Sequence, residues 1–208
     1  MSAGKQSLLP TRRPLICLIT KGASCGIEGT LEAIRAAIGH SVPLIQIREK
    51  QLPTRELYKL TSAAVKAAEN TNTMILVNER FDIAIDAGAD GVHLPSYAFT
   101  ADDVRRVAGP KFIIGVSCHS ADDVRVAKDI GADYVTLGPV FASPGKGTPI
   151  GIEAFASALR DVAPFPVIAL GGIDASNYRT VIDTGAAGFA AIRYLNDIPA
   201  LRKLMETL

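Results

Sequence analysis

AIDAGADGVHL, residues 84–94, decides the fold, because its pattern returns as AKDIGADYVTL at 127–137 and as VIDTGAAGFAA at 181–191. Each copy joins a helix-like stretch to an apolar run through a glycine followed by an alanine. Glycine at this place suits the left-handed residue that ends a helix, so each copy predicts a helix that stops, turns and enters a buried strand. A joint repeated in this way predicts α/β units around a parallel sheet.

Eight apolar runs bounded by turn residues are the predicted strands, and amphipathic stretches lie between them. The runs cover residues 15–20, 44–48, 74–78, 91–94, 112–117, 134–140, 166–170 and 188–192. Eight strands alternating with eight helices predict a single (β/α)8 TIM barrel over residues 14–208, after a flexible tail over 1–13. The alternative is an open doubly wound sheet, but no G-x-G-x-x-G follows the first run, so a dinucleotide-binding version has little support.

Three hydroxyl residues mark predicted helix starts. Thr54, Thr100 and Ser120 each precede an amphipathic stretch, and the last two are followed by aspartates. A hydroxyl at the first position accepts a backbone N–H, and acidic side chains suit the positive end of the helix dipole.

Composition narrows the classes of function. The 208 residues are 48% hydrophobic and carry a net charge of +1, which allows one sizeable core and gives no general signal for nucleic acid or a membrane surface. The start of the chain lacks a signal-peptide core, and no apolar run is long enough to cross a bilayer. Cys17, Cys25 and Cys118 form no CxxC pair, which favours reduced thiols, a cytoplasmic location and no zinc site.

The carboxyl ends of barrel strands are where such folds place their chemistry. Gln46, Arg48 and Lys50 alternate with apolar residues at the end of the second run, so all three point to one side. One amide and two cations at that spacing can hold phosphate or carboxylate groups. The competing interpretation is an internal ion pair, for example between Arg48 and Glu79.

Two histidines lie at strand ends. His93 stands inside an apolar run, which favours a structural imidazole with satisfied hydrogen bonds. His119 follows the fifth run and precedes a helix, where an imidazole can take and return a proton near neutral pH. Helix capping by His119 or Ser120 is the alternative. Cys118 is better explained as a small packing residue than as a nucleophile.

Anion-binding features follow the last three strands. The stretch 138–149 holds three glycines, three prolines and Lys146, a composition that allows a loop to close over a ligand. Lys146 either binds an anion there or only keeps the loop soluble. Gly171 and Gly172 follow the seventh run, and Ile192 and Arg193 follow the eighth, where barrels often bind phosphate. A tight turn that needs positive φ is the alternative explanation of the glycine pair.

Together these residues resemble the family of thiamine phosphate synthase and its relative TenI, the thiazole tautomerase, from Leu15 to about Leu195. The likeness rests on Gln46-x-Arg48-x-Lys50, Asn78, the stretch 88–94, Gly115-Val116-Ser117, the stretch 133–141, Lys146 and the stretch 168–173. The resemblance implies that Asn78 and Ser117 contact the substrate. It also implies that the substrate is a thiazole phosphate.

The chain departs from the synthase pattern at the metal. In the synthase an aspartate after the strand-three asparagine and a second one beyond the His-Leu of strand four hold Mg²⁺ against a diphosphate. Here Asn78 is followed by Glu79, and the second position falls on Ala98. Mg²⁺ is usually bound by one or two carboxylates plus substrate phosphates, so losing one carboxylate should weaken the site. The Leu-Pro-Ser of residues 94–96 is instead similar to TenI. TenI also carries a histidine at the position of His119, but so do some synthases, so the missing aspartate separates the two more than the histidine does.

The favoured function is therefore a TenI-like tautomerase in thiamine biosynthesis, with His119 as general acid/base and no metal or other cofactor. The alternative is thiamine phosphate synthase, which condenses a pyrimidine diphosphate with the thiazole phosphate using Mg²⁺ and Glu79. A non-catalytic binder or regulator of the thiamine pathway is the least favoured reading. A homodimer is one assembly that a small barrel allows.

Overall fold

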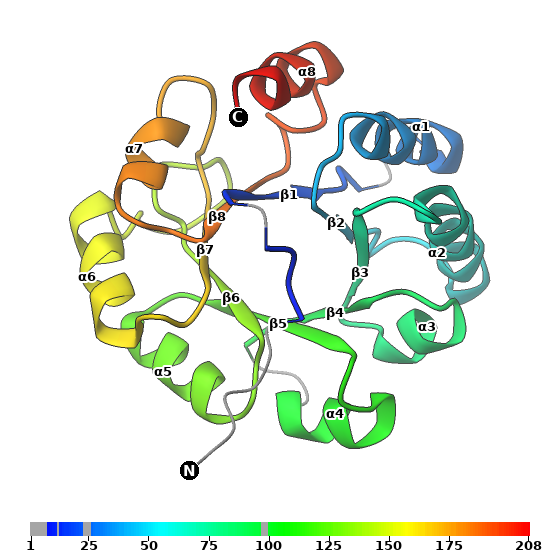
Figure 1. Cartoon of the computed structure of the whole chain (residues 1–208), viewed down its shortest axis with the longest axis horizontal. Coiled ribbons are helices and arrows are strands. Elements are labelled where there is room, and N and C mark those ends of the chain that lie inside the picture. Colours follow the sequence, from blue (N-terminus) through cyan, green and yellow to red (C-terminus); the bar gives the residue numbers. More distant parts are fainter. Residues whose placement is uncertain (1–7, 12, 23–25, 97–99) are drawn as a thin grey trace.

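Eight parallel strands close into a barrel in the computed structural model, which describes residues 8–11, 13–22, 26–96 and 100–208 (Figure 1). The strands are β1 (Leu15–Ile19), β2 (Leu44–Ile47), β3 (Met74–Asn78), β4 (Gly91–Leu94), β5 (Ile113–Cys118), β6 (Tyr134–Leu137), β7 (Val167–Leu170) and β8 (Gly188–Ala191). They lie in sequence order, and β8 pairs with β1 to complete the circle. The predicted TIM barrel is confirmed.

One helix follows each strand and packs outside the barrel (Figure 1). The helices are α1 (Gly26–Gly39), α2 (Thr54–Ala68), α3 (Phe81–Asp86), α4 (Ala101–Ala108), α5 (Ala121–Asp129), α6 (Ile152–Val162), α7 (Tyr178–Asp183) and α8 (Ile198–Thr207). None of these helices is both long enough and apolar enough to span a membrane, within the part of the chain that the structure describes.

The repeated joint explains how helices return to strands. Gly88, Gly131 and Gly185 all have positive φ, at 72°, 88° and 84°, as the pattern predicts. In the first two copies the next aspartate accepts a hydrogen bond from the preceding strand: Asp90 from the N–H of Ile75 and Asp133 from that of Ile114. The third copy has an alanine at this position and makes only the backbone bond to its strand.

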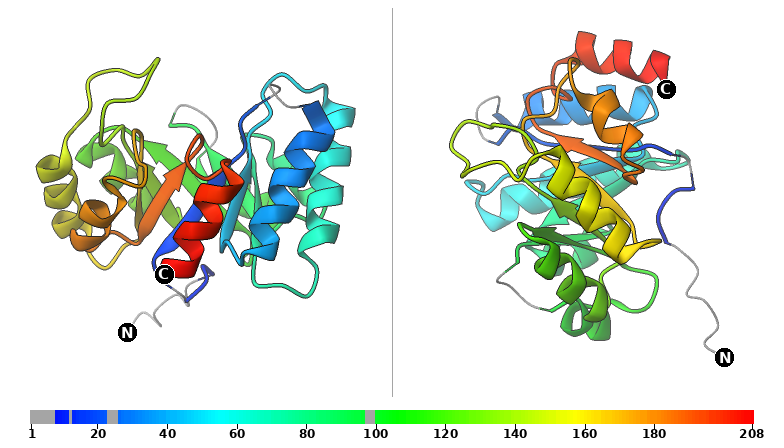
Figure 2. Two further views of the ribbon diagram at one scale, coloured as in Figure 1. Left: turned by 90° about the horizontal axis from the view of Figure 1, so that it is seen from above. Right: turned by 90° about the vertical axis from the view of Figure 1, so that its left-hand side faces the viewer.

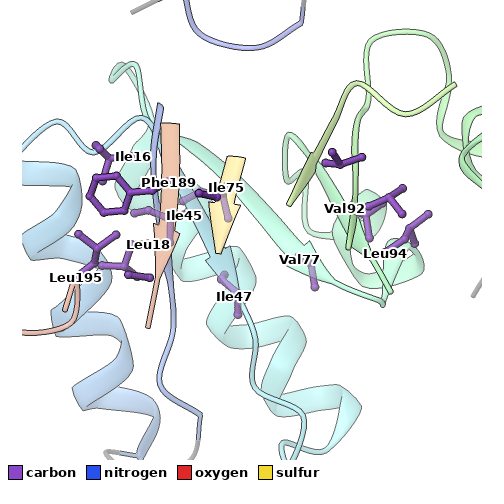
Figure 3. Close-up of a cluster of buried hydrophobic side chains, with 14 of the residues drawn as sticks. Ile16, Leu18, Ile45, Ile47, Ile75, Val77, Val92, Leu94, Phe189 and Leu195 are labelled. Carbon is purple, nitrogen blue, oxygen red and sulfur yellow. The ribbon is translucent and has the colours of Figure 1, made fainter. Parts of the chain in front are cut away.

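Strand alternation separates two cores. Side chains such as Ile16, Leu18, Ile45 and Ile47 point outward and pack beneath the helices (Figure 3). The alternate positions, including Cys17, Leu44 and Tyr134, fill the barrel interior. Each core is therefore lined by one face of the same strands.

Leu9 closes the end of the barrel opposite the carboxyl ends of the strands and corrects the predicted tail at this residue. Residues 1–13 are predicted to be flexible, yet Leu9 is 4% exposed and belongs to the interior cluster. The dark-blue segment before β1 crosses the barrel in Figure 1 and lies below it in the left view of Figure 2. Burial of Leu9 in the barrel interior accounts for the packing of this segment.

Helix starts agree with the sequence in two of three cases. Thr100 and Ser120 form complete capping boxes with Asp103 and Asp123. Thr54 does not cap α2, because Pro53 holds that position; its hydroxyl instead accepts from Arg80 at 3.1 Å. The predicted sixth strand also stops earlier, at Leu137, because Pro139 has no N–H to continue the ladder.

Candidate active site at the carboxyl ends of the strands

A cavity of about 560 Å³ opens at the carboxyl ends of the strands, within the size range of small-molecule sites. Every site residue predicted from the sequence lies on its wall. These are Gln46, Arg48, Lys50, Asn78, Glu79, Ser117, His119, Lys146, Gly171, Gly172, Ile192 and Arg193. The closed barrel gathers them, because they lie at the carboxyl ends of β2, β3, β5, β7 and β8 or in the loop after β6, and these ends form a single rim.

The β2 side of the cavity is built by alternation. Ile45 and Ile47 are fully buried in the outer core, so Gln46 points inward, where it is 3% exposed. Arg48 and Lys50 continue that side toward solvent and also line the cavity. The backbone N–H of Arg48 donates to the hydroxyl of Thr20 at 2.8 Å, which ties this segment to the end of β1.

Glu79 lies between two neighbours rather than in a carboxylate cluster. Its Oε1 is 3.5 Å from the ammonium of Lys50, and its Oε2 accepts from the side-chain amide of Asn78 at 3.1 Å. Lys50 thus takes the place that the ion-pair alternative gave to Arg48. Both partners are partly exposed, so the pair contributes little to stability.

The donor set fits Mg²⁺ poorly. Glu79 is the sole carboxylate among the described residues on the cavity wall, and both its oxygens already face other groups. No cluster of three or more His, Cys, Asp or Glu side chains suited to a metal occurs in the ranges that the structure describes. Ala98, at the second metal position of the synthase pattern, lies outside those ranges, as does Cys25.

His119 is held through one ring nitrogen, and the other has no hydrogen-bond partner among the residues that the structure describes. Its Nδ1 lies 2.9 Å from the carbonyl oxygen of Gly138. A carbonyl only accepts, so Nδ1 carries the hydrogen in the neutral ring and Nε2 has an open lone pair. Ser120, not His119, caps α5, and the carboxylate of Asp123 binds the backbone N–H groups of both residues.

The glycine pair after β7 serves a turn and also exposes donors. Gly171 and Gly172 have φ of 100° and 67°, and a Cβ on either would clash with Pro139 or Phe141. The tight-turn explanation is thus sufficient for their identity. Their N–H groups nevertheless find no acceptor among the described residues, while Ile192 and Arg193 line the same wall. Free amides beside an arginine suit an anion.

The loop that carries Lys146 stands over the cavity. Its two ends are joined by a hydrogen bond from Ile150 N–H to Pro139 O, and Phe141 N–H donates to Gly171 O. The yellow-green loop rises above the barrel in the left view of Figure 2. Lys146 is exposed there but still contributes to the cavity wall.

His93 is a satisfied buried imidazole, as the sequence predicts. It is 3% exposed, with Nδ1 2.9 Å from the Tyr134 hydroxyl and Nε2 2.9 Å from the Ser117 hydroxyl. Burial lowers its pKa to about 3. Sequence reasoning missed Thr136, which lines the cavity beside His93; a threonine within an apolar run carries no signal that separates it from ordinary packing.

Comparison with known proteins assigns the family. The model of the TMP-TENI family, described as thiamine monophosphate synthase, matches residues 16–195. The chain belongs to this family. It is therefore an enzyme of thiamine biosynthesis in the thiamine phosphate synthase and TenI group.

Individual relatives of this TMP-TENI family enzyme carry the synthase name. A putative thiamine-phosphate synthase of Geobacter sulfurreducens is 39% identical over 92% of this chain and 91% of its own. A thiamine-phosphate synthase of Caldicellulosiruptor bescii is 39% identical over 87% of this chain and 84% of its own. A solved thiamine phosphate pyrophosphorylase of Pyrococcus furiosus superimposes with a TM-score of 0.79 at 30% identity, covering 93% of this chain and 96% of that one.

Proposed function

We propose that the chain binds a thiazole phosphate in this cavity and moves a proton on a thiazole carboxylate phosphate, as a TenI-like tautomerase. The observation that carries the proposal is the orientation of His119. Its Nδ1 is held by Gly138, which leaves Nε2 on the rim of a cavity with a single described carboxylate. A neutral imidazole in this state can remove a proton from one ring position and return it to another, so no proton is gained or lost overall.

The charges around the cavity supply the remaining roles in this proposal. Arg48, Lys50, Lys146 and Arg193 oppose the one negative side chain, Glu79, so the described wall is net cationic. The Gly171 and Gly172 amides, with the backbone near Ile192 and Arg193, bind the phosphate. Arg48 and Lys50 orient the carboxylate, and Lys146 closes the loop over the ligand.

Three polar residues deeper in the cavity complete the substrate site. Gln46, Asn78 and Ser117 line it below the cationic rim and present an amide or a hydroxyl. Groups of this kind fix the orientation of a ligand that charge has attracted. We place the enzyme in the cytoplasm, where its buried thiols Cys17 and Cys118 stay reduced.

The test of this proposal is replacement of His119. His119→Asn keeps a side chain that can donate to Gly138 but removes the proton acceptor. We expect tautomerase turnover to fall about 10²- to 10⁴-fold with thiazole phosphate binding retained, because positioned acid–base groups contribute rates of that order. Ser120→Ala is the matched control, because it changes the neighbouring residue and removes only the hydroxyl that caps α5. Unchanged turnover in a folded His119→Asn enzyme removes His119 from the mechanism.

The second candidate is thiamine phosphate synthase, and the names of the relatives favour it over the first. This reaction needs Mg²⁺ beside a diphosphate, and Glu79 is the carboxylate of the described cavity wall that would bind the ion. If this candidate holds, Glu79→Gln should abolish Mg²⁺-dependent formation of thiamine phosphate. A tautomerase should largely tolerate the same change, because Glu79 takes no part in the proton shift.

A further inference from the structure

A chain of hydrogen bonds leads from the centre of the barrel to the substrate cavity. His93 on β4, Gly115 on β5 and Tyr134 on β6 lie at one register level, and Ser117 pairs with Thr136 one inward-facing level above. The Tyr134 hydroxyl is 2.9 Å from Nδ1 of His93, and Nε2 is 2.9 Å from the hydroxyl of Ser117. Ser117 lines the cavity, whereas Tyr134 is fully buried below it.

Gly115 makes this arrangement possible. A Cβ at that position would lie 2.2 Å from the ring of Tyr134 and 2.5 Å from its hydroxyl, so any side chain there would expel the phenol. The Tyr134 and His93 rings lie 5.5 Å apart with their planes tilted by 40°. The phenol is thereby fixed against one nitrogen of the imidazole.

The direction of each hydrogen bond follows from what the groups can donate. Burial raises the pKa of Tyr134 well above its usual value, so the phenol keeps its hydrogen. His93 is the sole acceptor near that hydroxyl among the described residues. Leaving a buried hydroxyl hydrogen unpaired is unfavourable, so Tyr134 donates to Nδ1.

The state of the imidazole then sets the state of the serine. His93 is neutral because burial lowers its pKa to about 3, so the ring has one N–H, and with Nδ1 accepting, that N–H is on Nε2. Nε2–H donates to Ser117, and Thr136 lies at a longer 3.4 Å. The Ser117 hydroxyl hydrogen is left to donate into the cavity.

We propose that His93 and Tyr134 are positioning residues that hold Ser117 as a hydrogen-bond donor toward an acceptor atom of the substrate. The inference rests on the proposed function for the identity of that substrate, a thiazole phosphate. The tautomer of His93 itself is independent of the ligand. The two parts are therefore tested separately.

The first test reads the tautomers directly. The chain has three histidines, so ring-nitrogen NMR of the histidine-labelled full chain at pH 7 is simple, and a His40→Gln and a His119→Asn variant assign the signals. We expect His93 to carry its hydrogen on Nε2 and His119 to carry it on Nδ1. A hydrogen on Nδ1 of His93, or a charged ring, overturns the proposal whatever the enzyme binds.

The second test is a double-mutant cycle on affinity, measured by calorimetry with the thiazole carboxylate phosphate. Tyr134→Phe keeps the ring but removes the hydroxyl that selects the tautomer. We expect its affinity to fall about threefold to tenfold, the factor that one hydrogen bond is worth. In a Ser117→Ala background the same change should have no further effect, because the donor is already gone.

The controls separate this outcome from a general loss of structure and from a wrong substrate. Tyr178→Phe, a buried tyrosine away from the cavity wall, should leave affinity unchanged. An equal loss from Tyr134→Phe with and without Ser117 means that Tyr134 acts only on folding and overturns the positioning role. If the wild type binds no thiazole phosphate, the proposed function fails, while the NMR result still decides the tautomer.

Discussion

The buried imidazole of His93 links the stability of the barrel to pH. Its pKa is about 3 in the folded state against about 6.5 in an unfolded chain, so between these values the unfolded chain binds the extra proton. Stability therefore rises with pH across this window and is lost as the pH falls below about 6.5.

The expected size of this effect is about 1.4 kcal/mol for each pH unit. Lowering the pH from 6.5 to 5 should cost the wild type about 2 kcal/mol through this group alone. His93→Gln can keep both hydrogen bonds but has no proton to gain, so its free energy of unfolding should vary less with pH. Urea denaturation at several pH values measures both slopes, and identical slopes would contradict the assignment.

Single residues of the cavity wall could be named from the sequence because each lies near the carboxyl end of a strand. Gln46, Arg48 and His119 are examples: alternation or a following helix start places them. The hydrogen bonds from Tyr134 through His93 to Ser117 could not be predicted, because they depend on the register between three strands that lie about 20 residues apart in the sequence. The Lys50–Glu79 pair was missed for a similar reason, since side-chain reach decides between Lys50 and Arg48.

At the scale of elements, the aspartate of the repeated joint connects a helix to two strands. The Asp133 carboxylate accepts from the N–H of Ile114 in β5 and from Arg105 of α4 at 2.7 Å. Arg105 also donates to the carbonyls of Phe112 and Gly131. The pair is largely buried, with side chains 17% and 6% exposed.

Removing this carboxylate should be costly. Asp133→Ala leaves the largely buried Arg105 without its counter-charge and the N–H of Ile114 without its acceptor, so we expect the free energy of unfolding to fall by about 3 kcal/mol. Asp122→Ala is the matched control, because Asp122 also pairs with an arginine but is 79% exposed. Its cost should stay below about 1 kcal/mol in the same denaturation experiment. Equal losses of unfolding free energy would mean that the Asp133 carboxylate contributes no more to stability than an exposed ion pair.

Element boundaries were predictable where local chemistry sets them. The glycine that ends the helix in each joint and the capping boxes at Thr100 and Ser120 depend only on residues nearby in the sequence. Thr54 failed because the preceding proline already occupies the capping position and Arg80, distant in sequence, takes its hydroxyl.

At the scale of the whole molecule, the two ends of the barrel have different tasks. The cavity and the Lys146 loop lie at one end, and the segment with Leu9 lies across the other (Figure 2). The closed barrel could be predicted by counting strand–helix units in the sequence. The contact of Leu9 with the barrel interior could not be predicted, because the residues around Leu9 do not distinguish a buried leucine from one in a flexible tail.

Leu9→Ala should test that contact. We expect it to lower the free energy of unfolding by about 2 kcal/mol or more, as for other buried leucines, with kcat and KM of the folded enzyme unchanged. Val107→Ala, at a residue that is 70% exposed, should change stability by no more than about 0.5 kcal/mol. A Leu9→Ala protein as stable as the wild type would show that the segment does not support the barrel.

The proposed chemistry is tested most directly by following both candidate reactions with one preparation, in EDTA and in Mg²⁺. We expect the thiazole carboxylate phosphate to be tautomerised equally well under both conditions. We also expect no thiamine phosphate, detected as fluorescent thiochrome, when pyrimidine diphosphate and thiazole phosphate are supplied with Mg²⁺. Thiamine phosphate formed only with Mg²⁺, at an ordinary turnover of about 1 s⁻¹ or more, would contradict the account and identify a synthase.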